Sequence, residues 1–165
     1  MEEKFIKFLK DNNIYDEKVL EFFKNNSTYV DYKDDDTKYF IGCYPKVENG
    51  ILKGVNICVP DMEDEVTVTI NIHEYVHTLE LYKKLNKEYK ETSYEEVLPV
   101  FYELIFFKEN VKTMADYSKF YEEHLMKYYE KEYLMVIELY NDLIKEYGDT
   151  SIEHLEKRVK RLIKK

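Results

Sequence analysis

Apolar residues near the N-terminus recur with the spacing of an α-helix. Residues 2–11 set apolar side chains among lysine and glutamate, and residues 16–24 repeat the pattern after a short polar break. Asp16 stands where a helix N-cap accepts backbone hydrogen bonds. Because both segments have one apolar and one charged face, they predict two short amphipathic helices packed on a core. The apolar positions are Phe5, Ile6, Phe8, Leu9, Val19, Leu20, Phe22 and Phe23.

The pattern changes to β-branched and aromatic runs between Thr28 and Pro60. Such runs, broken by turn residues, are typical of strands. Two of them flank the dipeptide Asn49-Gly50, which is a strong signal for a tight β-hairpin. The segment therefore predicts a small antiparallel sheet. The three runs are Tyr29–Tyr32, Tyr39–Tyr44 and Ile51–Val59.

A longer segment, from Pro60 to about Lys87, carries two conflicting patterns. Residues 66–72 alternate apolar and polar positions with period two, which by itself predicts a strand. His73 and His77, however, are four residues apart, and this spacing brings both side chains to one face of a helix. We therefore expect one helix across the segment, with Asp61 or an acidic neighbour as its N-cap.

The C-terminal half of the chain is expected to be helical. Residues 92–107 form an apolar-rich segment in which Pro99 should kink the helix by removing an internal hydrogen bond. A long segment from about Met114 to Tyr147 follows, ended by Gly148 as a left-handed cap. Residues 151–165 form a last helix with a basic end. The sequence therefore predicts an α+β fold that is mostly α.

Length and composition limit what the chain can be. Its 165 residues fit one domain, residues 1–165, and 44% hydrophobic with 36% charged residues is typical of a soluble globular protein. The net charge of −9 argues against a nucleic-acid partner. No apolar run reaches the ~20 residues of a membrane span. Cys43 and Cys58 are too few for a disulfide framework, so we expect a cytoplasmic protein with reduced thiols.

The sequence His73-Glu74-Tyr75-Val76-His77 is the strongest chemical signal in the chain. On a helix, His73 and His77 can both direct their imidazoles at one metal ion. Glu74 is rotated away from them, near enough to take a proton from a metal-bound water. Zinc brings the pKa of such a water to about 7, which makes it a usable nucleophile. In the competing interpretation, the two histidines are polar residues on a solvated helix face.

A catalytic zinc site usually has three protein ligands and one open position. Eighteen residues lie between His77 and Glu96, which is enough for one helix to end and a second to return alongside it. Glu103 lies seven residues further along, on the same helix face, so one carboxylate could bind the metal while the other orients a histidine. Alternatively, Ser93 and Glu96 form a capping box, and Glu96 folds back onto the helix N-terminus.

His73, Glu74, His77 and the downstream Glu96 resemble the gluzincin clan of zincin metallopeptidases, which includes thermolysin and the zinc aminopeptidases. In the aminopeptidases the interval before the third ligand is also eighteen residues, so this resemblance favours Glu96. The run from Glu96 to Glu103 is also similar to thimet-type oligoendopeptidases, and that alignment favours Glu103. The resemblance implies Zn²⁺ as the cofactor and a small sheet packed on a zincin-like active-site helix.

The resemblance implies two further features of the site. In zincins an edge strand beside the metal helix holds the substrate by pairing with it, and Gly54–Cys58 is the candidate here. In gluzincins a Tyr or His from beyond the metal helices donates to the oxyanion that forms during the reaction. His124, Tyr128 and Tyr129 are the candidates for that role in this chain.

These expectations combine into one functional hypothesis, a zinc-dependent metallopeptidase that hydrolyses peptides or proteins through a water activated by Glu74. The chain lacks the second lobe of larger gluzincins, so its cleft should be shallow, and a homodimer or a protein partner could complete it. Two alternatives stay open. One is a zincin-like regulatory or binding protein without turnover, and the other is a helical interaction module without a metal.

Overall fold

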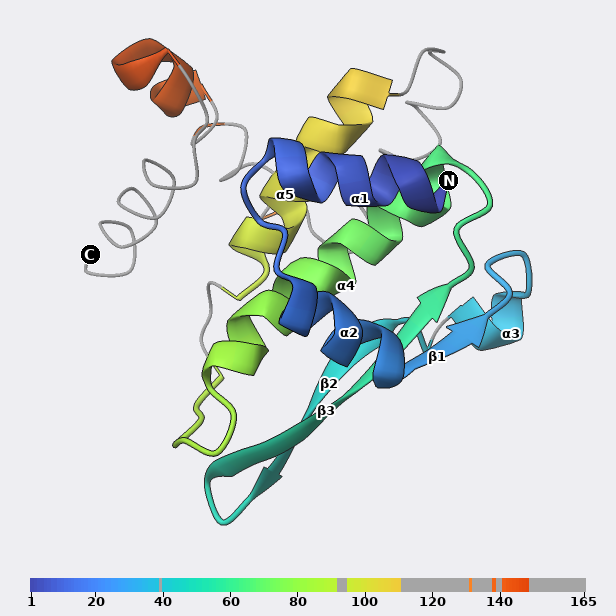
Figure 1. The fold of residues 1–165 in the computed structure, drawn as a ribbon, viewed down its shortest axis with the longest axis vertical. Helices are drawn as coiled ribbons and strands as arrows, with labels where there is room; N and C mark the ends of the chain where they lie inside the picture. The colour runs from blue at the N-terminus through green and yellow to red at the C-terminus, as the bar shows by residue number, and fades with distance from the viewer. Residues whose placement is uncertain (39, 92–94, 111–130, 132–137, 139–140, 149–165) are drawn as a thin grey trace.

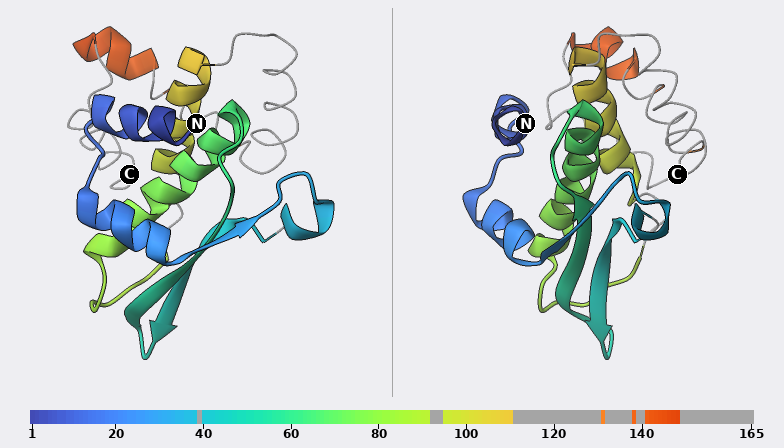
Figure 2. Two further views of the ribbon diagram at one scale, coloured as in Figure 1. Left: turned by 45° about the vertical axis from the view of Figure 1, so that its right-hand side comes forward. Right: turned by 90° about the vertical axis from the view of Figure 1, so that its right-hand side faces the viewer.

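The computed structural model describes residues 1–38, 40–91, 95–110, 131, 138 and 141–148. In this part of the chain the fold is α+β and mostly helical, as the sequence predicts. The helix α4 (Glu65–Lys83) runs through the middle of the molecule (Figure 1). The helices α1 (Glu2–Asp11) and α2 (Glu17–Asn25) lie on one side of α4, and α5 (Val97–Asn110) packs along another (Figure 2).

Helix α4 confirms the prediction that the histidine spacing outweighs the strand-like alternation before it. Neighbours cover α4 on several sides, so most residues from Thr67 to Val76 are buried whichever way they point. A helix buried all round needs no single apolar stripe, and this explains why its sequence does not have the helical period. Its N-cap is Asp64, an acidic neighbour of the expected Asp61, in a capping box with Thr67.

The two N-terminal helices also follow the sequence prediction. The Asp16 side chain accepts hydrogen bonds from the backbone N–H groups of Lys18 and Val19, at 2.9 and 3.1 Å, and so caps α2. The hydroxyl of Tyr75 on α4 donates to the carbonyl of Ile14 at 2.9 Å and accepts from the N–H of Asp16 at 3.1 Å. The turn between α1 and α2 is thereby attached to the central helix.

The sheet contains β1 (Ser27–Val30), β2 (Gly42–Glu48) and β3 (Ile51–Pro60) in the order β1-β3-β2. The predicted hairpin is confirmed, because Asn49 (φ 53°) and Gly50 (φ 77°) both take the left-handed conformation of a type I′ turn. Strands β2 and β3 are antiparallel, as predicted.

The prediction of a wholly antiparallel sheet is wrong, because β1 pairs parallel with β3. The connection after β1, which includes the short helix α3 (Asp35–Lys38), brings the chain to the opposite edge of β3 before β2 begins. The expected edge strand Gly54–Cys58 is therefore also wrong. It lies in the central strand β3, where the whole stretch pairs with β2 and Ile57 and Cys58 also pair with β1, whereas β2 is the edge strand beside α4.

Helix α5 begins at Val97, so Pro99 lies in its first turn. A residue in that turn has no intrahelical acceptor for its N–H, and the reason for expecting a kink at Pro99 does not hold. Further along, residues 141–147 are helical. Gly148 (φ 73°) ends that helix with its N–H bonded to the carbonyl of Ile144 at 2.9 Å, which confirms it as the left-handed cap. Within the described residues, every helix is too short or too polar to cross a membrane.

Candidate metal centre

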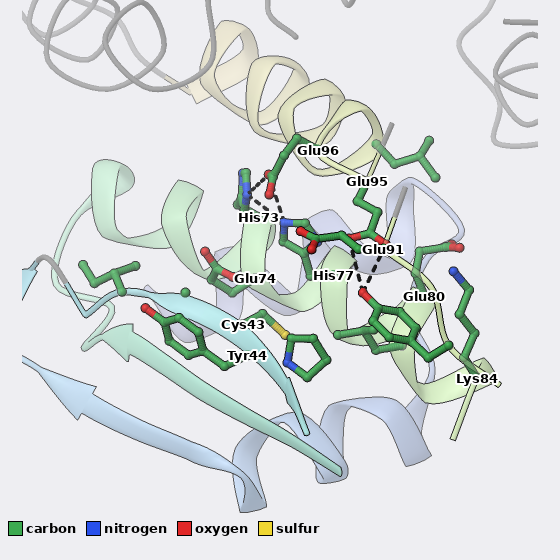
Figure 3. A pocket seen from close by; sticks show the side chains of 16 residues that line it. Cys43, Tyr44, His73, Glu74, His77, Glu80, Lys84, Glu91, Glu95 and Glu96 are labelled. Atoms are coloured by element: carbon green, nitrogen blue, oxygen red, sulfur yellow. Dashed lines mark hydrogen bonds and ion pairs between the residues drawn. The ribbon is translucent and has the colours of Figure 1, made fainter. Parts of the chain in front are cut away.

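His73 and His77 lie one turn apart on α4, and their Nε2 atoms face each other at 3.1 Å. Glu96, the residue before α5, directs its carboxylate between them. Its Oε2 atom lies 2.9 Å from Nε2 of His73 and 3.0 Å from Nε2 of His77. Figure 3 shows the three side chains meeting above the pocket floor. The structure thus brings together the two predicted histidines and one of the two predicted carboxylates.

The three atoms form a nearly equilateral triangle with the dimensions of a metal site. Ligands about 2.0–2.1 Å from a tetrahedral zinc ion lie about 3.3 Å from one another. The observed separations of 2.9 to 3.1 Å need only a small expansion to reach that value. At this spacing the three atoms share either a hydrogen, carried by an imidazole Nε2, or a metal ion. The donor set, two imidazoles and one carboxylate, is one that catalytic zinc sites use.

Glu103 occupies a different place in this arrangement. Its carboxylate is fully buried (0% exposed) and accepts a hydrogen bond from Nδ1 of His73 through Oε1. When His73 is neutral with its proton on Nδ1, the lone pair of Nε2 faces His77 and Glu96, whereas protonated His73 donates from both nitrogens. The geometry therefore separates the two carboxylates that the sequence left as alternatives. Glu96 lies at the convergence of the histidines, and Glu103 orients one of them.

Glu74 lies beside the triangle and faces the pocket (Figure 3). Its carboxylate and the ring nitrogens of His73 and His77 offer ligand atoms that all lie within 4.8 Å of one another. The Glu74 side chain is only 5% exposed. A carboxylate at this distance is close enough to contact a water molecule shared with the metal position, which is the role that the sequence motif predicts for it.

The electrostatics of the site favour bound cations. Burial acts to raise the pKa of Glu96, but hydrogen bonds and charge from His73 and His77 outweigh it and hold the pKa well below the usual range. Burial acts in the opposite direction on His77 and would lower its pKa. There the hydrogen bond to Glu96 and the charges of Glu74, Glu96 and Glu95 prevail, so the pKa of His77 is raised. A proton and a divalent ion would compete for this position.

A pocket of about 540 Å³ opens in front of these residues. Strand β2 forms one wall of the pocket, α4 forms its floor, and the segment leading to α5 forms the other wall (Figure 3). This is enough space for a few residues of an extended peptide. The residues that line it are Ile41, Gly42, Cys43, Tyr44, Pro45, His73, Glu74, His77, Glu80, Leu81, Lys84, Tyr89, Glu91, Glu95, Glu96 and Leu98.

Not every site candidate belongs to the part of the chain that the structure describes. His124, Tyr128 and Tyr129 lie outside the described residues, as does Ser93 of the capping-box alternative. The Glu96 side chain reaches the histidines of α4. Cys58 is a free thiol whose pKa is raised by burial, consistent with an unreactive residue.

Sequence reasoning missed the pocket walls on either side of the metal position. Tyr44 and Tyr89 both line the pocket, and each hydroxyl has a hydrogen-bond partner, the carbonyl of Phe40 for Tyr44 and the carboxylate of Glu95 for Tyr89. With 17 tyrosines in the chain, no local pattern separates these two from the rest. Tyr44 could be identified only from the strand order, which places β2 at the edge of the sheet beside α4.

Comparison with protein-family models, with curated proteins and with solved structures found no match to this chain.

Proposed function

We propose that this protein is a zinc-dependent metallopeptidase. The observation that carries the proposal is the convergence of His73 Nε2, His77 Nε2 and Glu96 Oε2 to within 3.1 Å of one another beside the buried Glu74. A structural cluster of two histidines and a glutamate would not need a fourth polar side chain facing an open pocket. The arrangement supports hydrolysis because it combines a cation position with an adjacent base.

In this proposal His73, His77 and Glu96 hold the ion, and Glu103 keeps the Nε2 lone pair of His73 available for it. Bound zinc would supply a Lewis acid that polarises a carbonyl and lowers the pKa of water. Glu74 accepts the proton from the attacking water and later donates it to the leaving amine. The low exposure of Glu74 limits competing contacts with bulk solvent, which suits that role.

The substrate we propose is an extended peptide that pairs with the edge of β2. Among the described residues β2 pairs only with β3, so the outer backbone groups of β2, apart from the missing N–H of Pro45, can pair with another strand. Residues 41–45 of this edge line the same pocket as Glu74 and the histidines. A peptide lying there would pass directly in front of the proposed metal position.

The test is a comparison of the wild type with Glu74→Gln. The wild-type protein, reconstituted with Zn²⁺, should cleave peptides in a mixed-sequence library followed by mass spectrometry. Glu74→Gln should keep its zinc and its folded state but lose activity by at least roughly a hundredfold, the contribution of a general base. Retained cleavage in Glu74→Gln would overturn the mechanism.

The second candidate function is a zincin-like binding protein without turnover. The absence of any matching relative leaves it open, and it shares the metal site and the pocket. It predicts zinc binding with peptide binding but no cleavage by the wild type, and Glu74→Gln would then change little. For either function we propose a cytoplasmic setting, because Cys43 and Cys58 are both free thiols.

A further inference from the structure

The pocket continues beyond His77 towards the end of α4, where Tyr89 forms part of its wall. This wall is held in place by backbone pairing with the start of β3. The N–H of Asn86 donates to the carbonyl of Leu52 at 2.8 Å, and the N–H of Tyr89 donates to the carbonyl of Gly50 at 2.9 Å. The side chain is fixed as well, because its hydroxyl donates to Glu95 at 3.1 Å. Tyr89 is therefore a preorganised aromatic surface beside the proposed metal centre.

The ammonium group of Lys84 already lies over the face of the Tyr89 ring. Nζ of Lys84 lies 5.7 Å from the centre of the Tyr89 ring, within the range of a cation–π interaction. Lys84 is itself a pocket-lining residue, and it is the C-cap residue of α4. Lys84 thus occupies the face of the Tyr89 ring that a lysine side chain of a bound peptide would also contact.

The charge around Tyr89 favours a cationic occupant over an anionic one. Glu80, Glu91 and Glu95 line this end of the pocket, and Lys84 is the one lysine or arginine among the described lining residues (Figure 3). The carboxylates of Glu74 and Glu96 add further negative charge towards the metal position. A divalent ion would offset these two, and Lys83 pairs with Glu80 at 3.7 Å. Glu91 and Glu95 then still outnumber Lys84 in the outer part of the pocket, and this excess of negative charge attracts cations.

We propose that the Tyr89 end of the pocket is a substrate subsite that takes a lysine or arginine side chain. The cation would lie on the Tyr89 ring, as Lys84 does now, with Glu95 and its acidic neighbours providing the counter-charge. A peptide paired with β2 would carry this basic side chain near its scissile bond. The inference rests on the proposed function for its meaning in catalysis, but binding at the subsite uses none of the metal ligands.

Binding is measured by fluorescence anisotropy with Glu74→Gln as the background, so that no peptide is cleaved. Three labelled peptides differ at one position, which carries lysine, norleucine or glutamate. The lysine peptide should bind roughly threefold to tenfold more tightly than the norleucine peptide, and the glutamate peptide should bind most weakly. Repeating the titration without zinc should preserve the order. Equal binding of the lysine and norleucine peptides would overturn the subsite.

Four variants in this background separate recognition from a structural role. Tyr89→Leu and Glu95→Gln should remove the lysine preference while leaving norleucine binding unchanged. Tyr89→Phe, the matched control, keeps the ring and should keep most of the preference. Lys84→Ala removes the internal competitor and should tighten binding of the lysine peptide. Weaker binding of the glutamate peptide by Lys84→Ala, with no gain for the lysine peptide, would show that Lys84 selects anionic groups and would contradict the proposal.

Cleavage data distinguish a failure of this inference from a failure of the proposed function. If the wild type cleaves a peptide library without enrichment of lysine or arginine at any position, the metallopeptidase stands and the subsite is overturned. If the wild type cleaves nothing but the Glu74→Gln background still discriminates lysine from norleucine through Tyr89, the subsite stands and the metallopeptidase is overturned.

Discussion

The Nδ1–H of His73 donates to the buried carboxylate of Glu103, and the opposite nitrogen of the same ring faces His77 and Glu96. One hydrogen bond therefore fixes both the tautomer and the direction of the first proposed ligand. Because Glu103 lies on α5 and His73 on α4, the same contact also sets how these two helices pack. The geometry of the site and the packing of the core cannot be separated at this point.

Glu103→Ala should weaken zinc binding by roughly 10–100-fold, the usual cost of removing a partner of a metal-binding histidine. Glu103→Gln keeps an acceptor for Nδ1–H without the charge and should have a smaller effect. Competition with a chromophoric chelator measures both affinities, and circular dichroism checks that each variant is folded. Unchanged zinc affinity in a folded Glu103→Ala protein would contradict the orienting role.

Glu96→Gln should lose far more zinc affinity than its neighbour Glu95→Gln. Oε2 of Glu96 lies within 3.0 Å of both histidine nitrogens, whereas the Glu95 carboxylate accepts from Tyr89. Glu95→Gln is therefore a matched control one residue away, and its zinc affinity should stay within about threefold of the wild type, since only a nearby charge is lost. Competition with the same chromophoric chelator measures the zinc affinity of both variants. Equal losses in the two variants would show that general negative charge, and not coordination by Glu96, retains the metal.

Zinc affinity should increase as the pH rises. The raised pKa of His77 means that the metal-free protein holds a proton at the ligand position above the ordinary histidine range. That proton stabilises the metal-free fold at low pH, and this contribution to stability is lost as the pH rises through the raised pKa of His77. Zinc must displace it, so binding releases protons. Calorimetry in two buffers of different ionisation enthalpy, near pH 6.5, should show this release. Binding enthalpies that do not depend on the buffer would contradict it.

The stability of the fold should fall in alkali through Tyr75. Burial raises the pKa of Tyr75 to about 12, from an ordinary value of 10.0. Its contribution to stability is therefore complete below pH about 10 and is lost as the pH rises towards 12, by roughly 2–3 kcal/mol in all. The main reason is that burial disfavours the charged phenolate, which also could not donate to the carbonyl of Ile14.

Urea unfolding of the wild type and Tyr75→Phe tests this at two pH values. Near pH 8 the wild type should be more stable by about 1–2 kcal/mol, because the variant lacks both hydrogen bonds of the hydroxyl. Near pH 11 the difference should close. Tyr29→Phe, at an exposed position on β1, should match the wild type at both values. A difference between wild type and Tyr75→Phe that stays constant with pH would be the contrary result.

Much of the fold was accessible from the sequence because its signals are local. Asp16, Asn49-Gly50 and Gly148 each act through their own backbone conformation or that of the next few residues, and each prediction is confirmed. Sheet order is different, because the pairing of β1 with β3 depends on where a connecting segment takes the chain. No residue within β1 encodes a parallel neighbour, so the expected edge strand was misplaced.

The site divides in the same way. The spacing of His73 and His77 is a helical property, and α4 realises it. The choice between Glu96 and Glu103 depended on where the second helix begins. Because α5 starts at Val97, Glu96 lies before its first turn and can reach across to both histidines, while Glu103 is held in the core. Helix boundaries are the part of a fold that sequence patterns determine least well.

The most direct test of the proposed centre is a crystal structure of the zinc-loaded protein with anomalous diffraction measured at the zinc absorption edge. It should show a zinc ion about 2.0–2.2 Å from Nε2 of His73, Nε2 of His77 and a carboxylate oxygen of Glu96, with Glu103 still bonded to Nδ1 of His73. An anomalous peak elsewhere, or no peak between these three side chains in protein soaked with excess zinc, would contradict it.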